Sequence, residues 1–402
     1  MQLEKTYEKA MQVLRENSKP KGFVATNTKK DNYQRVWSRD GIIQGLAAIM
    51  SGDNKLIETL KENLFTLKKY QDKTGRIASN IDTKKKKVSY GTLVGKVDAT
   101  LWYIIGAGQY YKKAGNKQFL KKFESSLDKA VFYLESVELN GKGLLYIPTG
   151  GDWADEYITH GYVLFDQLLY LQALKEYNHI KKKLKKNPKE IEPKIKKLQK
   201  QIETNFFPSK EKINKKEVYN KGLYEKIFKK YNKKYPLMYF SSDGFADYLD
   251  GFANSLVLIL NLNGEEYREN IINLLNKQKK KQKIKILPAF WPPIKRMHYH
   301  WKVLKMNSLF GFRNKPHHYH NGGLWPLVTG FYIAGLMEQG KKQEARKMLI
   351  GFAKEMEKDN FWFHEYFDSK RYKPRGIKKL GFSAAGFAIA YLAVIKNKKV
   401  FS

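Results

Sequence analysis

Carboxylate, amide, guanidinium and imidazole groups occur at six places along the chain, each within a few residues of an aromatic side chain. These places are the segments 37–40, 97–98, 151–156, 241–243 and 317–323, and Glu365. Asp, Ser and Asn are common helix N-caps, so any one of them alone has a structural explanation. Caps do not require a neighbouring Trp or Arg, however. Groups that hydrogen-bond hydroxyls, set among rings that stack on sugar faces, are typical of a saccharide pocket.

Paired carboxylates in such a pocket can cleave a glycosidic bond. One must be protonated to donate to the leaving oxygen, and the other must be ionised to take a proton from water. Asp98 and Glu365 are among the carboxylates of these segments, with Asp155 and Glu156 as secondary site candidates. Each has a structural alternative. Glu365 could pair on the surface with Lys370 or Arg371, and Arg39 with Asp40 could form a buried ion pair at the mouth of the fold.

The elements that position these groups follow from hydrophobic periodicity. Apolar residues recur at helical spacing, with a charged opposite face, in 3–14, 56–67, 119–134 and 345–356, and more weakly in 191–204 and 265–277. Between them lie segments that are apolar or small nearly all round: 41–50, 99–111, 162–174, 244–262, 323–337 and 383–395. Helices of that composition must be buried on all sides. Strand signals are few, with 84–90 and 143–147 as small hairpins at most.

Amphipathic and buried helices therefore alternate six times, which predicts six helical hairpins closed into a ring. The expected fold class is an all-α (α/α)6 barrel, with residues 1–402 as a single catalytic domain. An irregular helical array is the alternative. The chemistry-bearing segments stand at or just before the start of successive buried helices. If these helices run parallel, all the groups meet at one end of the barrel.

Several motifs resemble those of known (α/α)6 glycoside hydrolases. Val97-Asp98-Ala99-Thr100-Leu101-Trp102 resembles the general-acid motif of neutral/alkaline invertases and of the amylo-α-1,6-glucosidase domain of glycogen debranching enzymes. The segment 320–326, His-Asn-Gly-Gly-Leu-Trp-Pro, is similar to their motif at the fifth inner helix. Residues 363–368, Phe-His-Glu-Tyr-Phe-Asp, resemble the segment that holds the catalytic base. Residues 37–40 and 152–153 match sugar-binding positions near the bond that breaks.

The resemblance implies that Asp98 is the acid and Glu365 the base of an inverting reaction. It also implies substrate-binding roles for a set of residues around them: Trp37, Arg39, Asp40, Trp102, Asp152, Trp153, His320, Asn321 and Trp325. The expected activity is exo-acting hydrolysis of α-glucosides, as in a debranching-type α-1,6-glucosidase, with sucrose cleavage as the alternative. A sugar isomerase or epimerase and a non-catalytic glycan- or nucleic-acid-binding protein are alternatives of other classes.

The charge and cysteine content bound the partners. The formal net charge is +37 and no cysteine is present, which excludes disulfides, thiolate zinc sites and thiol nucleophiles. The lysine runs lack aromatic residues spaced for bases, so we expect a solvated surface without a specific nucleic-acid site. The region 179–235 is expected to form a lysine-rich outer helix and a long connection. The spacing of His317, His318 and His320 does not fit a metal site. We expect a mono-, di- or oligosaccharide substrate, no cofactor, no membrane span and a cytoplasmic location; the oligomeric state is left open.

Overall fold

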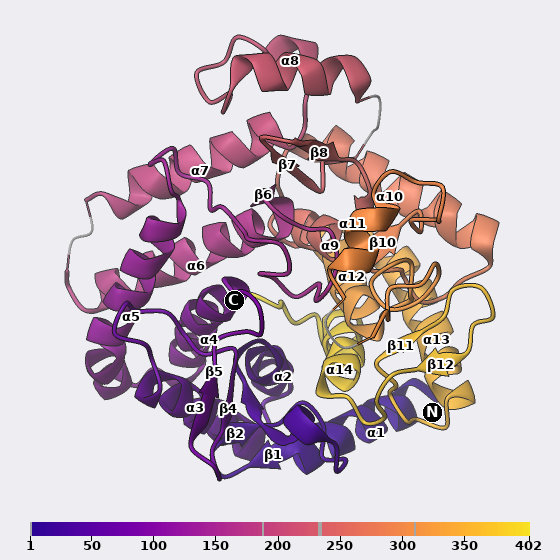
Figure 1. The fold of residues 1–402 in the computed structure, drawn as a ribbon. Coiled ribbons are helices and arrows are strands. Elements are labelled where there is room, and N and C mark those ends of the chain that lie inside the picture. The colour runs from indigo at the N-terminus through magenta and orange to yellow at the C-terminus, as the bar shows by residue number, and fades with distance from the viewer. Residues whose placement is uncertain (1, 187–188, 232–234, 309–310) are drawn as a thin grey trace.

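In the computed structural model, helices form two concentric rings around a common axis (Figure 1). The structure describes residues 2–186, 189–231, 235–308 and 311–402. The inner ring consists of α2 (Ser38–Ser51), α4 (Asp98–Ala114), α6 (Leu164–Lys183), α9 (Gly251–Ile259), α12 (Pro326–Glu338) and α14 (Gly381–Lys396). Each inner helix packs against the next, and α14 packs against α2, so the ring is closed.

The outer ring consists of α1 (Gln2–Asn17), α3 (Asn54–Lys69), α5 (Lys117–Val137), α7 (Ile191–Asn205), α10 (Gly264–Gln282) and α13 (Lys342–Lys358). Outer and inner helices alternate along the chain, which confirms the predicted (α/α)6 architecture. Two shorter helices, α8 (Lys221–Lys230) and α11 (Trp301–Met306), lie in connections. None of the helices in the described ranges is long and apolar enough to span a membrane.

Polar caps and small residues explain where several helices begin and how closely they pack. The side chains of Asp53, Asn116 and Asp250 accept backbone N–H groups at the starts of α3, α5 and α9. Between α12 and α14 the backbones approach so closely that a Cβ on Gly330 would lie 2.0 Å from the carbonyl oxygen of Gly386. Glycine at this position is therefore required for the inner ring to close.

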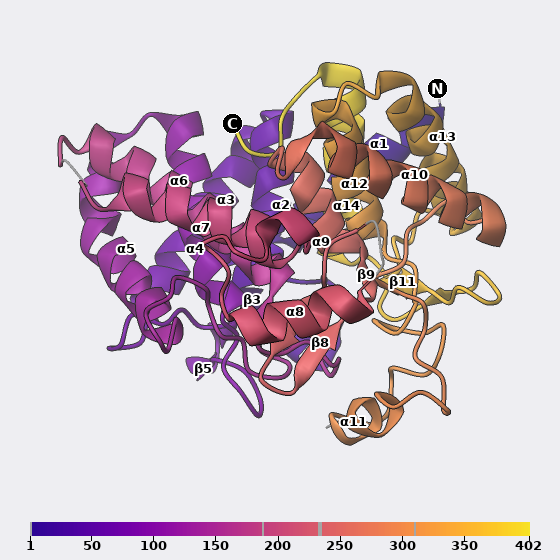
Figure 2. The same cartoon turned by 90° about the horizontal axis from the view of Figure 1, so that it is seen from above.

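Short strands form small sheets at the end of the barrel where the inner helices begin (Figure 2). One sheet joins β3 (Val36–Trp37), β4 (Asn80–Asp82) and β5 (Lys87–Ser89), and another joins β6 (Tyr162–Val163), β7 (Tyr239–Ser241) and β8 (Gly244–Ala246). Two pairs of strands lie at the same end of the barrel: β9 (Leu249–Asp250) with β10 (Phe290–Trp291), and β11 (Tyr366–Phe367) with β12 (Pro374–Arg375). The pair of β1 (Ser18–Lys19) and β2 (Gly22–Phe23) follows α1.

Three expectations from the sequence differ from the structure. Residues 244–250 form β8 and β9, so the fourth inner helix starts only at Gly251, after the cap of Asp250. Lys181 lies in the last turn of the inner helix α6 and not in an outer helix; its ammonium pairs with Glu124 and Asp128 of α5. The segment 143–147 forms no hairpin, and only Ile147 makes an isolated bridge, to Gly161.

Candidate active site

A cavity of about 630 Å³ opens at the end of the barrel where the inner helices begin. Of the eleven residues to which the resemblance assigns a catalytic or substrate-binding role, seven line it: Trp37, Arg39, Asp40, Trp153, His320, Trp325 and Glu365. The other four, Asp98, Trp102, Asp152 and Asn321, are fully buried and lie outside the lining. The elements thus meet where the sequence predicted, but four of the eleven predicted side chains do not line the cavity.

The first turn of α2 places Arg39 and Asp40 at the cavity, directly after Trp37 of β3. The indole N–H of Trp37 donates to the carbonyl oxygen of Asn32 at 2.9 Å, which fixes the ring at the cavity wall. Asp40 is 5% exposed. Burial raises the pKa of its carboxyl to about 7, although the Arg39 charge acts in the opposite direction.

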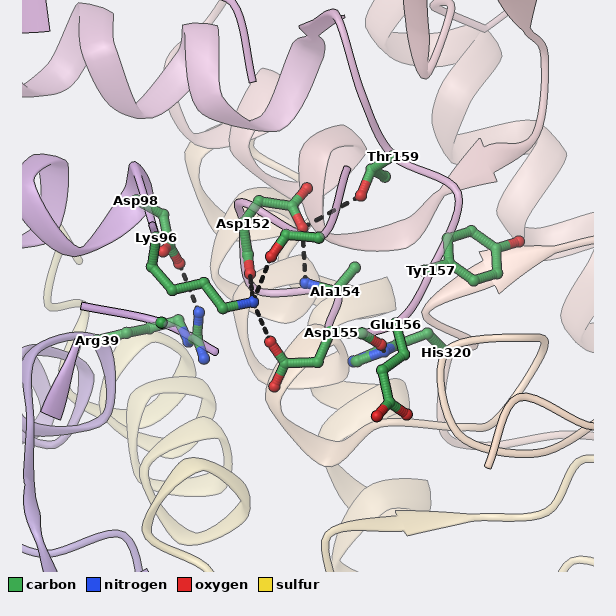
Figure 3. A network of polar contacts seen from close by, with 12 residues as sticks. Arg39, Lys96, Asp98, Asp152, Ala154, Asp155, Glu156, Tyr157, Thr159 and His320 are labelled. Atoms are coloured by element: carbon green, nitrogen blue, oxygen red, sulfur yellow. Dashed lines mark hydrogen bonds and ion pairs between the residues drawn. The ribbon is translucent and has the colours of Figure 1, made fainter. Parts of the chain in front are cut away.

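Asp98 is the first residue of α4, and Arg39 pairs with it at 2.6 Å (Figure 3). The carboxyl is completely buried, whereas the arginine lines the cavity. The expectation that Asp98 faces the cavity is therefore wrong. The physical reason is that Arg39 of the neighbouring helix fills the space that an acid would need in order to reach a substrate.

The loop between α5 and α6 contributes Trp153 and Asp155 to the cavity. Asp152 holds this loop, since its carboxylate accepts the backbone N–H of Ala154 at 2.9 Å and the hydroxyl of Thr159 at 3.2 Å. The expected role of Asp152 in lining the cavity is corrected to one of shaping the loop. Its own pKa is raised to about 6, mainly by burial.

Asp155 forms an ion pair with Lys96, which lies two residues before α4 (Figure 3). The Lys96 ammonium also donates to the carbonyl oxygen of Asp152 at 3.0 Å. Removal from bulk water opposes ionisation of Asp155, but the charges of Lys96 and Arg39 outweigh it and lower the pKa of this carboxyl to about 2. About a third of the side chain stays open to the cavity, at 31% exposure.

The connection before α12 supplies His320 and Trp325, whose rings stack with centroids 5.0 Å apart. Nδ1 of His320 is 3.1 Å from the carbonyl oxygen of Asp155. Burial lowers the pKa of His320 to about 3, so the ring is neutral. In the same connection Arg313 pairs with Glu156 at 3.1 Å, and both line the cavity.

Asn321 holds this connection together from the inside. Its side-chain oxygen accepts the N–H of Ile294 at 2.6 Å, and its amide nitrogen donates to the carbonyl oxygens of Ile294 and Asn314. These bonds occupy the amide with backbone partners, so the structure does not place it where it can contact a substrate. Trp102 is likewise enclosed within α4 and its neighbours.

Glu365 lies in the connection before α14, directly before β11. Its backbone N–H donates to the carbonyl oxygen of Ile377 at 2.9 Å, and the hydroxyl of Tyr33 donates to its carboxylate at 3.4 Å. Burial raises the pKa of the Glu365 carboxyl, and the Arg313 charge partly opposes this shift. The side chain is 7% exposed, which excludes the surface pairing considered from the sequence.

Three buried polar atoms of cavity-lining residues have no hydrogen-bond partner within the described part of the chain. They are Nε of Arg39, Nε1 of Trp153 and Nε2 of His320. Buried polar groups are normally satisfied, so these atoms could take a ligand hydroxyl as partner once the cavity wall opens to them. Together with six aromatic rings on the walls, from Tyr33, Trp37, Trp153, Tyr319, Trp325 and Phe382, they form a surface typical of sugar binding.

The sequence did not single out Tyr33, Lys96 or Arg313, which all line the cavity. None of them lies in a segment that pairs a carboxylate with an aromatic residue at a helix start. Asp155 was considered only as a secondary candidate, although it lies three residues after Asp152. Its position in the loop before the third inner helix, like that of the other polar segments, was the feature of the sequence that could have identified it as a cavity residue.

Comparisons with known proteins agree with this architecture. The family model described as alkaline and neutral invertase matches residues 4–238 and 246–393. No curated protein matches the sequence. Among solved structures, the GH63 mannosylglycerate hydrolase from Thermus thermophilus in complex with Tris is 13% identical, with a TM-score of 0.67, over 95% of this chain and 99% of that one.

Two further structures have the same fold. The glucoamylase from Saccharomycopsis fibuligera is 12% identical, with a TM-score of 0.64, over all of this chain (100%) and 96% of that one. The GH78 rhamnosidase of Bacillus sp. GL1 is 14% identical, with a TM-score of 0.66 and coverage of 98% of this chain. This chain spans only 35% of that rhamnosidase.

Proposed function

Because the chain belongs to the alkaline and neutral invertase family and is a glycoside hydrolase, we propose that it hydrolyses short α-glucosides with inversion, with sucrose as the first candidate substrate. The observation that carries this proposal is the placement of two cavity carboxylates on facing sides of the ring. Asp155 precedes the third inner helix, α6, and Glu365 precedes the sixth, α14.

Positions three helices apart in a closed ring of six are diametrically opposed. An inverting hydrolase needs its two carboxyl groups on opposite sides of the sugar. They lie roughly 6.5–9.5 Å apart, because a water molecule must fit beside the sugar. Asp40 starts the first inner helix, next to the sixth, and is therefore on the same side as Glu365. This geometry favours Asp155 over Asp40 as the partner of Glu365.

We assign Glu365 as the base that takes a proton from water, in agreement with the sequence resemblance. Asp155 replaces Asp98 as the proton donor to the leaving oxygen, because it is open to the cavity while Asp98 is sealed behind Arg39. Lys96 keeps Asp155 ionised in the ligand-free structure. Donation therefore requires that the Asp155 carboxyl leaves Lys96 and binds a proton when a substrate fills the cavity.

The size of the cavity supports a short substrate. At about 630 Å³ it lies within the range of roughly 300–1,000 Å³ typical of small-molecule sites. A disaccharide would bring one ring to the inner polar atoms of Arg39, Trp153 and His320 and the other toward the mouth. Sucrose and the α-linked glucose disaccharides have this size.

A product analysis tests the proposal. The purified protein is incubated with sucrose, maltose, isomaltose, panose and trehalose, and the anomer of the released glucose is followed by NMR before mutarotation. Sucrose carries its only glucose as the unit whose anomeric carbon is attacked, so inversion at sucrose releases β-glucose first. Initial α-glucose from sucrose would contradict the inverting assignment, and no release of glucose from any of these sugars would contradict the substrate class.

Hydrolysis of α-1,6-linked glucosides is the second candidate. It is favoured by the segment 97–102, which resembles the motif shared with the glucosidase domain of debranching enzymes. The same panel separates the two candidates, since a sucrose-specific enzyme leaves isomaltose and panose intact.

A further inference from the structure

The wall of the cavity nearest its mouth is built by the sheet of β3, β4 and β5. Trp37, Asn80 and Ser89 are directly paired across the three strands, and all three line the cavity. Successive side chains in a strand point to opposite faces. Val36 points into the core, at 2% exposure, so Arg35 points to the same side as Trp37 and also lines the cavity.

The basic residues of the cavity fall into two groups. Arg39, Lys96 and Arg313 each pair with a carboxylate, those of Asp98, Asp155 and Glu156. Lys30 and Arg35 make no ion pair with any carboxylate in the part of the chain that the structure describes. Lys30 is exposed and Arg35 is partly exposed, which places the two uncompensated charges toward the mouth.

Arg35 is held in place without being neutralised. Its Nη1 donates to the side-chain oxygen of Asn80 at 3.0 Å. Asp82 is its neighbour across β3 and β4, but Oδ1 of Asp82 accepts the backbone N–H groups of Lys84 and Lys85 at 3.1 and 3.0 Å in the turn toward β5. The guanidinium is thus fixed by an amide; beside the N–H bonds from Lys85 and Lys84, its charge helps to lower the pKa of the nearby Asp82 carboxyl, but the two groups form no ion pair.

We propose that this outer wall, with Arg35 and Lys30, binds an anionic group on the leaving part of the substrate, a phosphate ester or a carboxylate. The inference rests on the proposed glucoside hydrolysis. Arg and Lys both bind phosphate and carboxylate through charge-assisted hydrogen bonds. At the inner end of the cavity Arg39, Lys96 and Arg313 are each paired with a carboxylate, so these basic groups are less available to an anion than Arg35 and Lys30. The charge distribution therefore orients an anionic glucoside with its neutral glucosyl ring inward and its anion at the mouth.

Matched substrate pairs test the proposal. Sucrose is compared with sucrose phosphorylated on the fructosyl ring, and glucosylglycerol is compared with glucosylglycerate. We expect kcat/KM for at least one anionic member to exceed that of its neutral counterpart about tenfold at low salt, the equivalent of about 1.4 kcal/mol. The preference falls as salt is added, because the charges lie near solvent. The pair that shows it identifies phosphate or carboxylate as the recognised group.

The variant Arg35→Gln removes the charge, so we expect the ratio of kcat/KM for the anionic substrate to kcat/KM for the neutral one to fall close to one. Arg35→Lys keeps a positive charge and should retain part of the preference for the anionic substrate. Lys87→Gln is the matched control, because Lys87 is an exposed lysine of β5 outside the cavity lining. A ratio near one in the unmodified protein, or a preference that survives Arg35→Gln, overturns the proposal.

A binding measurement separates this test from the proposed hydrolysis. Calorimetry on Glu365→Gln compares fructose 6-phosphate with fructose and glycerate with glycerol, with and without Arg35→Gln. If no glucoside is cleaved, the proposed activity fails, but tighter binding of the anions that depends on Arg35 still supports the anion site. Equal binding of anionic and neutral ligands overturns it even when glucosides are cleaved.

Discussion

At the scale of single residues, the position of a carboxylate relative to Arg39 decides what it can do. Arg39 separates the buried Asp98 carboxyl from the cavity, whereas Asp155 lines the cavity itself. We expect Asp155→Asn and Glu365→Gln each to lower kcat by about 10²–10⁴, the usual contribution of proton transfer. Both substitutions are nearly isosteric. Thermal unfolding should change little in Glu365→Gln, whereas Asp155→Asn also removes the carboxylate that pairs with buried Lys96 and should lower the unfolding temperature.

Asp98→Asn is the contrasting variant. Removing this charge leaves Arg39 buried without its partner, which costs about 3–5 kcal/mol in comparable buried pairs. We therefore expect a clear fall in the free energy of unfolding, measured with urea, together with any loss of activity. An Asp98→Asn protein of unchanged stability with kcat reduced as strongly as in Asp155→Asn would restore Asp98 as the donor.

The raised pKa of Asp40 gives a pH dependence of stability. Burial moves the pKa of this carboxyl from its ordinary value of 3.8 to about 7. Below the ordinary value the group is protonated in both the folded and unfolded states, and above pH 7 the folded state must bury a charge. Stability from protonated Asp40 is therefore lost as the pH rises from about 4 to about 7.

Asp40→Asn removes this dependence. The difference in unfolding free energy between variant and parent, measured with urea at pH 5 and pH 8, should shift in favour of the variant by about 3 kcal/mol at the higher pH, at about 1.4 kcal/mol for each unit of pKa. A constant offset arising from lost contacts cancels in this comparison. A difference that does not change with pH would show that Asp40 is ionised in the folded protein at pH 5.

At the scale of elements, the hairpin of β11 and β12 holds the base in position. Gly376, which follows β12, has a φ of +75°, and a Cβ there would lie 2.3 Å from Oε2 of Glu365. We expect Gly376→Ala to displace this carboxylate and to reduce kcat at least about tenfold, because small misplacements of a catalytic group are costly.

Gly340→Ala is the matched control for this experiment. Gly340 has a φ of +71°, but a Cβ there meets nothing within 4 Å. Both substitutions place alanine in left-handed backbone and should cost similar stability, on the order of 1 kcal/mol. Only the variant beside Glu365 should lose activity; equal kcat values for the two would show that Gly376 does not position the base.

Closure of the inner ring gives a second prediction at this scale. Gly330→Ala forces α12 away from α14 and should destabilise the protein by about 1–3 kcal/mol, as overpacking does. Gly351 lies in the outer helix α13, where an added Cβ would come no closer than 3.3 Å, to the flexible side chain of Lys285. There the change to alanine should be neutral or stabilise by up to about 1 kcal/mol through helix propensity. Urea unfolding of the two variants checks the contrast.

At the scale of the whole molecule, the net charge of +37 comes mainly from lysines, and among the described residues only Lys30 and Lys96 of these line the cavity. Lys182, Lys183, Lys185 and Lys186 are exposed at the C-terminal end of α6, opposite the end that bears the cavity. We expect replacement of all four by Gln to leave kcat/KM for a neutral disaccharide unchanged within about twofold, because exposed charges beyond a Debye length of about 10 Å are screened. A large rise in KM would show that this end of the barrel contributes to binding.

The sequence by itself determined the architecture. Six amphipathic segments, two of them weak, alternate with six segments that are apolar nearly all round, and this pattern favours a closed double ring over an irregular helical array. It also determined which end carries the site, since the polar and aromatic segments recur at the starts of the buried helices. Seven residues to which the resemblance assigned a role, among them Arg39, Trp153 and Glu365, line the cavity.

Only the tertiary structure decided which carboxylates reach a substrate. Asp98 and Asp155 lie at the starts of neighbouring inner helices or in the loops that precede them, and local sequence treats them alike. Their difference comes from side chains contributed by distant segments, because Arg39 of α2 covers Asp98 while Lys96 holds Asp155 at the cavity wall. The pKa shifts of Asp40 and Glu365 also depend on burial by several helices at once. Helical periodicity specifies which face of a helix is buried, but packing between helices decides which polar side chain at the end of the barrel stays open.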